Sequence, residues 1–180
     1  MPVERQVLTG AGLHSLPLLR SATAADLAAL ASLEARSFPP AEAADAARLK
    51  DRLQVFPDRF WLLCQGSELL AYACGLLTDE PDLVDDMYAN ARLHNPDGHW
   101  QMLFSVCTDA RFRHQGLATR LLQEIGAQIA AEGRCGIVLT CKDALIPLYA
   151  QAGFADEGIS PHSSHGGVAW HQMRLVCQRT

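Results

Sequence analysis

Residues 111–122 read RFRHQGLATRLL, and an apolar helical pattern begins within them at Leu117. The first turn of a helix exposes unpaired backbone N–H groups and the positive end of the helix dipole, so this junction can bind an anion. Gly116 lacks a Cβ and Ala118 is small, which lets a bulky phosphate approach the backbone. The glycine spacing matches neither a Walker loop nor a dinucleotide-binding fingerprint, which argues against a nucleoside triphosphatase or a dehydrogenase. Taken alone, a helix start with surface arginines explains the stretch equally well.

The composition is that of an ordinary folded protein with a small acidic excess. The 180 residues are 49% hydrophobic and 19% charged, with 15 Lys+Arg against 20 Asp+Glu and a formal net charge of −5. This length fits one domain with a substantial core. The charge gives no support to nucleic-acid binding, which needs a basic face. Because residues 1–15 show no sustained period, we expect a flexible arm there and a single domain over residues 16–180.

The six cysteines are scattered through mostly apolar stretches. They form no Cys-x-x-Cys pair, and no His/Cys group has the spacing of zinc ligands. Since no signal-peptide pattern occurs at the N-terminus, we expect reduced, buried thiols in a cytoplasmic protein without a metal. No apolar run approaches the roughly 20 residues that span a bilayer, so we expect no membrane partner.

Hydrophobic periodicity predicts the elements of the first half of the chain. Leu27, Leu30 and Leu33 share one face of a helix over residues 23–38, which begins with a capping-box pair of Thr23 and Asp26. The pattern also predicts a strand over 16–20, a second helix over 41–56, and a hairpin over 59–78 with its turn at 65–68. The stretch 79–93 is ambiguous, with a short helix as one reading.

Strands and helices alternate in the second half. A turn signal, NPDG at 95–98, precedes an apolar run that is the best candidate for a central strand. The expected elements are a strand over 99–109, a helix over 115–132, a strand over 135–141, a helix over 143–154 and a last strand over 167–177. This order indicates a single α+β domain around one mixed sheet.

The letters around Gly116 carry a resemblance to a known family. RHQGLA at 113–118 resembles the Arg/Gln-x-x-Gly-x-Gly/Ala signature of the GCN5-related N-acetyltransferases (GNAT), whose loop holds the pyrophosphate of acetyl-CoA. KDALIPLYAQAGF at 142–154 and HGGVAWHQM at 165–173 make the chain similar to the arylalkylamine (serotonin) N-acetyltransferase branch of that family. The implied fold is a mixed, mostly antiparallel sheet with splayed central strands, flanked by helices, with acetyl-CoA wedged in the gap.

The resemblance implies where acetyl-CoA binds. Backbone groups of Val106, Cys107 and Thr108 are expected to pair with the pantetheine arm like an added strand. Arg113 would contribute charge beside the pyrophosphate. The backbone amides that would wrap the pyrophosphate belong to His114, Gln115, Gly116, Leu117, Ala118 and Thr119.

Tyr149 carries over from the family pattern as the general acid that protonates the departing thiolate. A phenol has a reference pKa of about 10 and a thiol one of about 8.5, so this transfer works only if the hydroxyl is positioned at the sulfur. The alternative is a core tyrosine that fills the gap between a helix and the sheet.

The general base is where this sequence departs from the family. Vertebrate members of the branch carry two histidines that relay the proton of the amine, and the matching positions here are Met102 and Phe104. Strand alternation puts both side chains on one apolar face with Trp100, which suits an aryl group in the acceptor pocket. His99 is a candidate proton acceptor. Without a base, the enzyme must select the rare neutral form of the amine.

Phe38 and Pro39, in SFPP at 37–40, resemble the loop of the family that closes over the amine substrate. A helix stop with a core phenylalanine is the alternative for this pair. The function that these residues imply is acetyl-CoA-dependent acetylation of small primary amines, with arylalkylamines as acceptors and direct transfer in a ternary complex. Acceptors that are aliphatic amines, polyamines or protein amines stay open, as does a non-catalytic acetyl-CoA-binding module. The oligomeric state is open as well.

Overall fold

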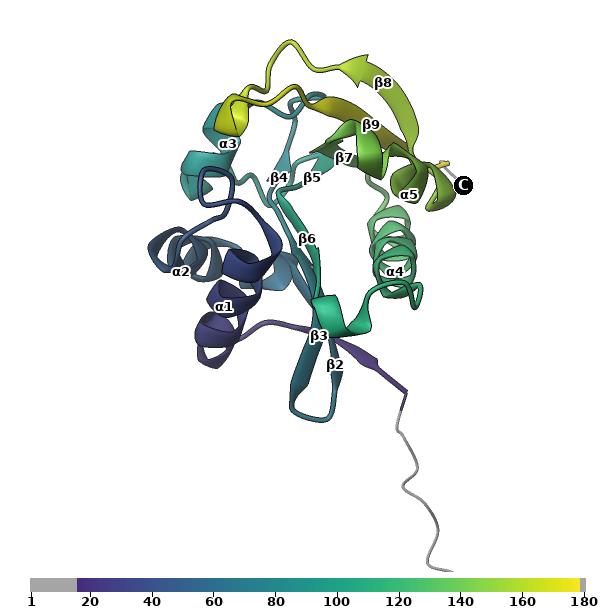
Figure 1. Cartoon of the computed structure of the whole chain (residues 1–180). Helices are drawn as coiled ribbons and strands as arrows, with labels where there is room; N and C mark the ends of the chain where they lie inside the picture. Colours follow the sequence, from purple (N-terminus) through teal and green to yellow (C-terminus); the bar gives the residue numbers. More distant parts are fainter. Residues whose placement is uncertain (1–15, 179–180) are drawn as a thin grey trace, which may run out of the picture.

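The computed structural model describes residues 16–178, so the arm expected over residues 1–15 lies outside the described part. Within that part the strands form two sheets that diverge from each other (Figure 1). The first sheet has the order β1 (Leu18–Ser21), β2 (Phe60–Gln65), β3 (Glu68–Cys74), β6 (Ser105–Thr108). The second has the order β4 (Leu77–Thr78), β5 (Trp100–Leu103), β7 (Gly136–Cys141), β9 (His171–Val176), β8 (Ala155–Ile159).

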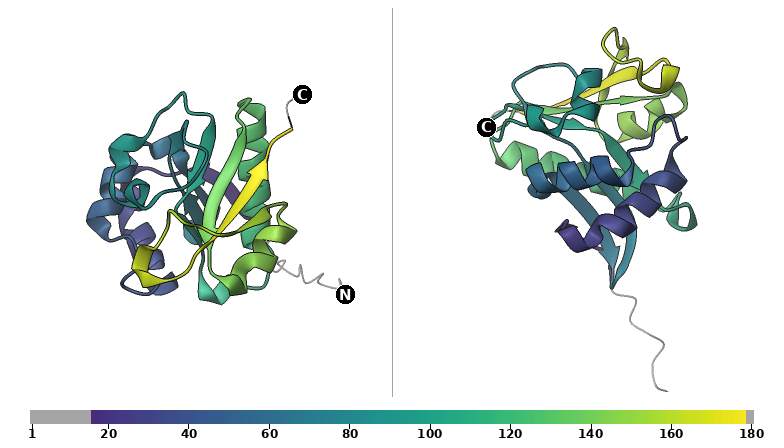
Figure 2. Two further views of the ribbon diagram at one scale, coloured as in Figure 1. Left: turned by 90° about the horizontal axis from the view of Figure 1, so that it is seen from above. Right: turned by 90° about the vertical axis from the view of Figure 1, so that its left-hand side faces the viewer.

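The expected α+β fold with a mixed, mostly antiparallel sheet is confirmed. Each strand pair is antiparallel among the described residues except β5 with β7, which run parallel. Helices α1 (Leu27–Ser37) and α2 (Ala46–Val55) lie on one side of the strands, and α4 (Leu117–Ala131) lies on the other (Figure 2). Strand β2 shows why both faces are covered, because Leu62 packs into the core under α1 and Leu63 into the core under α4.

The start of α1 follows the sequence prediction. Thr23 and Asp26 form the capping box around a short 3₁₀ turn, Ala24–Asp26, with the Thr23 amide 2.7 Å from the Asp26 carboxylate. The second helix begins at Ala46, five residues later than the expected residue 41, because the amides of Glu42 and Ala43 bond back to the Pro39 carbonyl in a turn. Asp45 then caps α2 by accepting a 2.8 Å hydrogen bond from the amide of Arg48.

The strand expected over residues 99–109 is divided at Phe104. Residues up to Leu103 pair with β7 in the second sheet, while residues from Ser105 onward pair with β3 in the first. Leu103 packs into the core under α4, and Phe104 packs against the core under α1. Strand β6 is therefore an edge strand, and β7 runs away from it across a widening gap (Figure 1).

The rest of the chain surrounds that gap. Helix α4 ends before Gly133, whose φ of +71° lets it act as the expected C-terminal cap. The helix expected over 143–154 is a 3₁₀ turn, Asp143–Leu145, that continues into α5 (Ile146–Gln151). The ambiguous stretch 79–93 contains α3 (Asp85–Ala89) and a 3₁₀ turn, Ala91–Leu93. Strand β8 was not expected, and it pairs with β9 at the edge of the second sheet.

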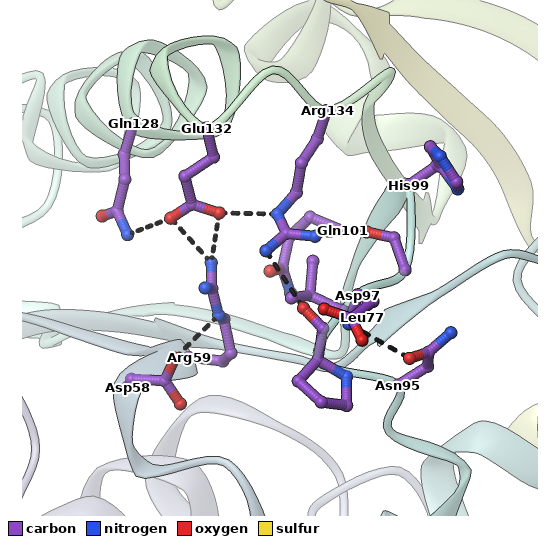
Figure 3. A network of polar contacts seen from close by, with 12 residues as sticks. Asp58, Arg59, Leu77, Asn95, Asp97, His99, Gln101, Gln128, Glu132 and Arg134 are labelled. Atoms are coloured by element: carbon purple, nitrogen blue, oxygen red, sulfur yellow. Dashed lines mark hydrogen bonds and ion pairs between the residues drawn. The ribbon is translucent and has the colours of Figure 1, made fainter.

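An ion-pair network lies at the C-terminal end of α4, where Arg59, Glu132 and Arg134 meet (Figure 3). Glu132 accepts a 2.9 Å contact from Arg59 and a 2.6 Å contact from Arg134. Arg134 also donates to the carbonyls of Pro96 and Gly98. The network thus links the end of α4 to the residues just before β2, β5 and β7. Among the helices of residues 16–178, none has the length and apolar character that crossing a membrane requires.

Candidate active site

Side chains from both diverging strands line one pocket. It is built from the end of α1 and the loop after it, from α3, from the β5–β6 junction, from the end of β7, and from α5 and the loop before β9. The lining residues are Glu34, Phe38, Glu42, Tyr88, Leu103, Phe104, Val106, Leu139, Thr140, Cys141, Leu145, Tyr149, His165 and Trp170.

Tyr149 reaches this pocket from α5, a short helix with Pro147 in its first turn. Only 5% of the residue is exposed, and its ring packs edge-on against Phe154 with 6.0 Å between centroids. Burial, together with the nearby thiols of Cys141 and Cys107, raises the pKa of the Tyr149 phenol well above its ordinary value. The hydroxyl therefore stays protonated at neutral pH and is available as a proton donor inside the pocket.

Aromatic rings form one wall of the pocket. The Tyr88 ring stacks on His165 at 4.8 Å and 8°, and it packs against Phe104 at 5.0 Å. The Tyr88 hydroxyl lies 2.7 Å from the Thr140 hydroxyl on β7. Burial raises the pKa of the Tyr88 phenol to about 12. The indole of Trp170 donates a 2.7 Å hydrogen bond to the His165 carbonyl. These bonds and ring contacts fix the aromatic side chains in place along the pocket.

Glu34 supplies a buried carboxylate at the side of the pocket nearest α1. Only 2% of the Glu34 residue is exposed to solvent. Oε1 accepts hydrogen bonds from the Ala44 amide at 3.0 Å and from Ser105 Oγ at 3.1 Å. Oε2 accepts from the Tyr72 hydroxyl and, at 3.4 Å, from Cys107 Sγ. Four donors from α1's own loop and from β3 and β6 hold this carboxylate in one position.

These four donors are all neutral. Burial raises the pKa values of Tyr72 and Cys107 well above their ordinary range, so both keep their protons. Among the ion pairs found between residues 16 and 178, none includes Glu34. Glu34 therefore places at the pocket a buried carboxyl group that is held by neutral donors and has no charged partner among residues 16–178.

The unpaired edge of β6 faces the gap beside this pocket. The Asp109 amide bonds to the Leu70 carbonyl on β3, and pairing alternates every second residue along an antiparallel strand. The N–H and C=O groups of Val106 and Thr108 consequently point to the open edge, while those of Cys107 point toward β3. The expected pairing of an extended ligand arm fits Val106 and Thr108; Cys107 instead turns its thiol toward Glu34.

The loop before α4 has the backbone of an anion site. Gly116 is the N-cap with a φ of +75°, and a Cβ placed on it would meet nothing within 4 Å. Within the described chain, no backbone partner is found for the amides of residues 113–119. Arg113 is exposed, and its Nε donates a 3.3 Å bond to the Thr108 carbonyl. The amides of His114, Gln115, Gly116, Leu117, Ala118 and Thr119 are thus free to bind phosphate oxygens.

The pocket brings together some of the residues predicted for the acceptor site and omits others. Phe38 and Phe104 line it, whereas Pro39 is exposed and Met102 is fully buried in the core under α1. Met102 and Phe104 do share one face, as strand alternation predicts. His99 lies four positions before Leu103, about 13 Å along an extended chain. Its side chain is 63% exposed, and its Nδ1 lies 2.6 Å from Oδ1 of Asp79.

Most of the pocket residues were not predicted from the sequence, among them Glu34, Tyr88 and Trp170. Glu34 did leave a signal, because it stands four residues after Leu30 and directly after Leu33 in the apolar face of α1. A charged residue in such a stripe must find partners in the core. Tyr88 lies in the short helix α3 and Trp170 in the irregular segment before β9, and neither stretch has a periodic pattern long enough to indicate which way a ring points.

Comparisons with known proteins agree with this arrangement. The model of the acetyltransferase (GNAT) family matches residues 27–154. Serotonin N-acetyltransferase of Macaca mulatta is 33% identical over 90 residues, which are 48% of this chain and 41% of that protein. The chain therefore spans less than half the length of this curated relative. The match confirms the resemblance to the arylalkylamine branch.

Solved structures show the same fold. A GphF GNAT-like decarboxylase in complex with isobutyryl-CoA superimposes with a TM-score of 0.71 at 21% identity, over 89% of this chain and 100% of that one. The ribosomal-protein-S18-alanine N-acetyltransferase of Escherichia coli gives 0.68 at 19% identity, over 92% and 96%. At these identities the likeness concerns the fold alone. With the family model matching most of its length, the chain belongs to the acetyltransferase (GNAT) family.

Proposed function

We propose that this protein is an acetyl-CoA-dependent N-acetyltransferase of small primary amines, with arylalkylamines as its preferred acceptors. The observation that carries the proposal is the single pocket in which Tyr149, Glu34 and the aromatic wall meet beside the open edge of β6. The partial match to a serotonin N-acetyltransferase supports the same acceptor class.

The residues present fit acetyl-CoA. The open edge of β6 offers backbone groups of Val106 and Thr108 to an extended arm, and the unpaired amides before α4 suit a pyrophosphate. Gly116 leaves the space that such a group requires. When bound, acetyl-CoA supplies an acetyl thioester as the acyl donor.

Proton transfers accompany acetylation, because a C–N bond forms at the amine and the C–S bond of the thioester breaks. An ammonium substrate loses one proton before it attacks and a second after the C–N bond forms, while the departing thiolate gains one, so one proton is released to solvent overall. We assign the removal of the first proton to Glu34, whose buried carboxyl group lines the pocket and passes that proton on to solvent. We assign the protonation of the thiolate to Tyr149, which burial keeps protonated and which the second proton of the amine restores. Glu34 replaces His99 as the proposed base, since His99 is exposed and outside the pocket.

The cysteines support direct transfer rather than an acyl-enzyme. Cys141 lines the pocket, but burial raises the pKa of its thiol to about 12. Burial also raises the pKa of Cys107 well above its ordinary range. A thiol that stays protonated is a poor nucleophile. The amine itself is therefore the group that attacks the thioester in our proposal.

A panel of acceptors tests the proposal. Initial rates of thiol release from acetyl-CoA would be measured with phenethylamine and tryptamine, with n-alkylamines, with linear diamines and with a short peptide bearing a free N-terminus. We expect the arylalkylamines to give the highest kcat/KM, since their rings can stack against Tyr88 and Trp170. A preference for the peptide would indicate a protein acetyltransferase. Binding of acetyl-CoA without turnover of any amine would indicate a non-catalytic module.

A further inference from the structure

A second carboxylate lies at the pocket, and it carries its own cation. Glu42, in the turn between α1 and α2, lines the pocket with a side chain only 6% exposed. Lys142 directly follows β7, and its Nζ lies 2.7 Å from Glu42 Oε1. The same ammonium lies 5.7 Å from the centre of the Trp170 ring, which also lines the pocket. Lys142 therefore places a positive charge beside the aromatic wall.

The two carboxylates of the pocket thus differ in charge balance. Glu34 is held by neutral donors only, whereas Glu42 is neutralised by Lys142. The Glu42 backbone is fixed too, because its carbonyl lies 3.0 Å from Nε2 of His165. The two carboxyl groups are connected through a short stretch of chain, because Ala44, whose amide donates to Glu34, is only two residues after Glu42. Glu34 has no charged partner among residues 16–178, whereas Glu42 already has an ammonium partner.

We infer that Lys142 is a specificity-determining residue that restricts the acceptor pocket to monoamines. This inference rests on the proposed function and names a limit on the acceptor class. A linear diamine that presents one nitrogen for acetylation carries a second ammonium group. Within the pocket that second cation meets the Lys142 ammonium instead of a free carboxylate, and like charges in a partly buried space repel. A monoamine carries no second charge and does not incur this repulsion.

Removing the Lys142 charge should therefore admit diamines. In Lys142→Met an unbranched apolar side chain one atom shorter replaces the ammonium group, so Glu42 loses its partner and Trp170 loses the cation over its ring. The partly buried Glu42 carboxylate then becomes a site for the second ammonium of a diamine. A diamine whose second ammonium group pairs with Glu42 is therefore favoured, because an unpaired buried carboxylate is costly.

The experiment compares kcat/KM for 1,3-diaminopropane, 1,4-diaminobutane and 1,5-diaminopentane with that for the n-alkylamine of equal carbon number. We expect Lys142→Met to raise the diamine-to-monoamine ratio at least tenfold for one spacer length, equivalent to about 1.4 kcal/mol. Lys142→Arg keeps the cation and should keep the wild-type ratio. Lys142→Met combined with Glu42→Gln removes both charges and should give a ratio clearly below that of Lys142→Met, because the free carboxylate is then absent.

The outcomes separate this inference from the proposed function. If the wild-type protein acetylates monoamines and Lys142→Met leaves the ratio unchanged at all three lengths, the specificity role is overturned while the proposed function stands. If kcat/KM in Lys142→Met falls equally for monoamines and diamines and the melting temperature is lower, the Lys142–Glu42 pair only stabilises the contact between two loops. If the wild-type protein turns over neither amine, the proposed function fails and the inference fails with it.

Discussion

Ser105 Oγ donates a 3.1 Å hydrogen bond to Oε1 of Glu34, although 71 positions separate the two residues in the chain. The bond joins α1 to β6 at the point where the sheet divides. Tyr72 on β3 and Cys107 on β6 reach the other carboxylate oxygen. A carboxyl group is thereby held at the pocket by the same strands whose divergence creates the pocket.

The first prediction concerns the pH dependence that this carboxylate produces. If Glu34 accepts the proton, the ammonium form of the amine is the productive substrate. We then expect kcat/KM to stay level from about pH 6.5 to about pH 9 and to change only near the pKa of the amine, about 10. In Glu34→Gln only the neutral amine reacts, so kcat/KM should fall roughly 10²-fold at pH 7 and rise about tenfold per pH unit. Initial rates across this range with phenethylamine provide the measurement.

Ser105→Ala is the matched control for that experiment. It removes one donor to Glu34 but keeps the carboxylate, so it should retain the level profile even if the protein loses stability. A wild-type profile that already climbs tenfold per pH unit would mean that the enzyme selects the neutral amine. Glu34 would then be a structural carboxylate and not the base.

Several parts of this fold were accessible from local sequence signals. The capping box at Thr23, the Gly66 turn of the hairpin and the Gly133 cap each follow from one or two residues with a specific backbone preference. Tyr149 lies in the pocket, as its motif implies, because the helix that carries it packs directly against β8 and β9. Short-range rules suffice for such positions.

Other features depend on partners far away in the chain. The residues around Phe104 are mostly apolar, and nothing in their pattern marks the change from one sheet to the other. Strand β8 reads ADEGI and is largely exposed, and its pairing with β9 determines its conformation. Glu34 is surrounded by donors from positions 44, 72, 105 and 107, and only the folded chain brings them together.

The second prediction concerns the hydroxyl of Tyr149. Tyr149→Phe keeps the ring that packs against Phe154 and removes only the proposed proton donor. We expect kcat to fall roughly 10²-fold while the Kd for acetyl-CoA, measured by calorimetry, is unchanged. Because burial raises the pKa of this phenol, wild-type kcat should show no loss from tyrosine ionisation below about pH 10.

Tyr88→Phe tests whether that effect is specific. It deletes the other buried phenol of the pocket, which bonds Thr140 at 2.7 Å, and also keeps its ring. Its effect on kcat should be much smaller than that of Tyr149→Phe. Equal losses in the two variants, or full activity in Tyr149→Phe, would make Tyr149 a packing residue.

The third prediction concerns the loop before α4. Gly116→Asp should place a carboxylate among the unpaired amides and weaken acetyl-CoA binding at least tenfold, about 1.4 kcal/mol. Gly116→Asn is the matched control, since asparagine has the same size and tolerates the left-handed backbone at φ +75° better than most residues. Calorimetry should show a distinctly smaller loss for the asparagine variant. If the two variants bind equally well, charge at this loop does not affect the ligand.

The last prediction concerns His171, which fastens the start of the segment that carries Tyr149. Its Nε2 lies 2.9 Å from Asp143, the first residue of the turn that leads into α5, and its Nδ1 lies 3.0 Å from Asp156 on β8. With a carboxylate at each ring nitrogen, the protonated form is favoured, and the hydrogen bond to Asp156 is the largest cause of its raised pKa. The imidazolium can satisfy both carboxylates, whereas the neutral ring can donate to only one.

The sign of the pH effect follows from that raised pKa. A group whose pKa is higher in the folded state stabilises the protein fully below its unfolded pKa, about 6.5, and this contribution is lost as pH rises through the folded value. The melting temperature of His171→Gln should therefore lie below that of the wild-type protein at pH 6, and the difference should shrink by pH 9. His99→Gln is the matched control, because His99 bonds a single carboxylate and both partners are exposed, so its effect should be smaller at every pH. Thermal unfolding of the three proteins from pH 5.5 to 9 provides the measurement. If His171→Gln lowers the melting temperature by the same amount at pH 6 and pH 9, the histidine stabilises this edge by packing, and its charge does not hold the α5 segment in place.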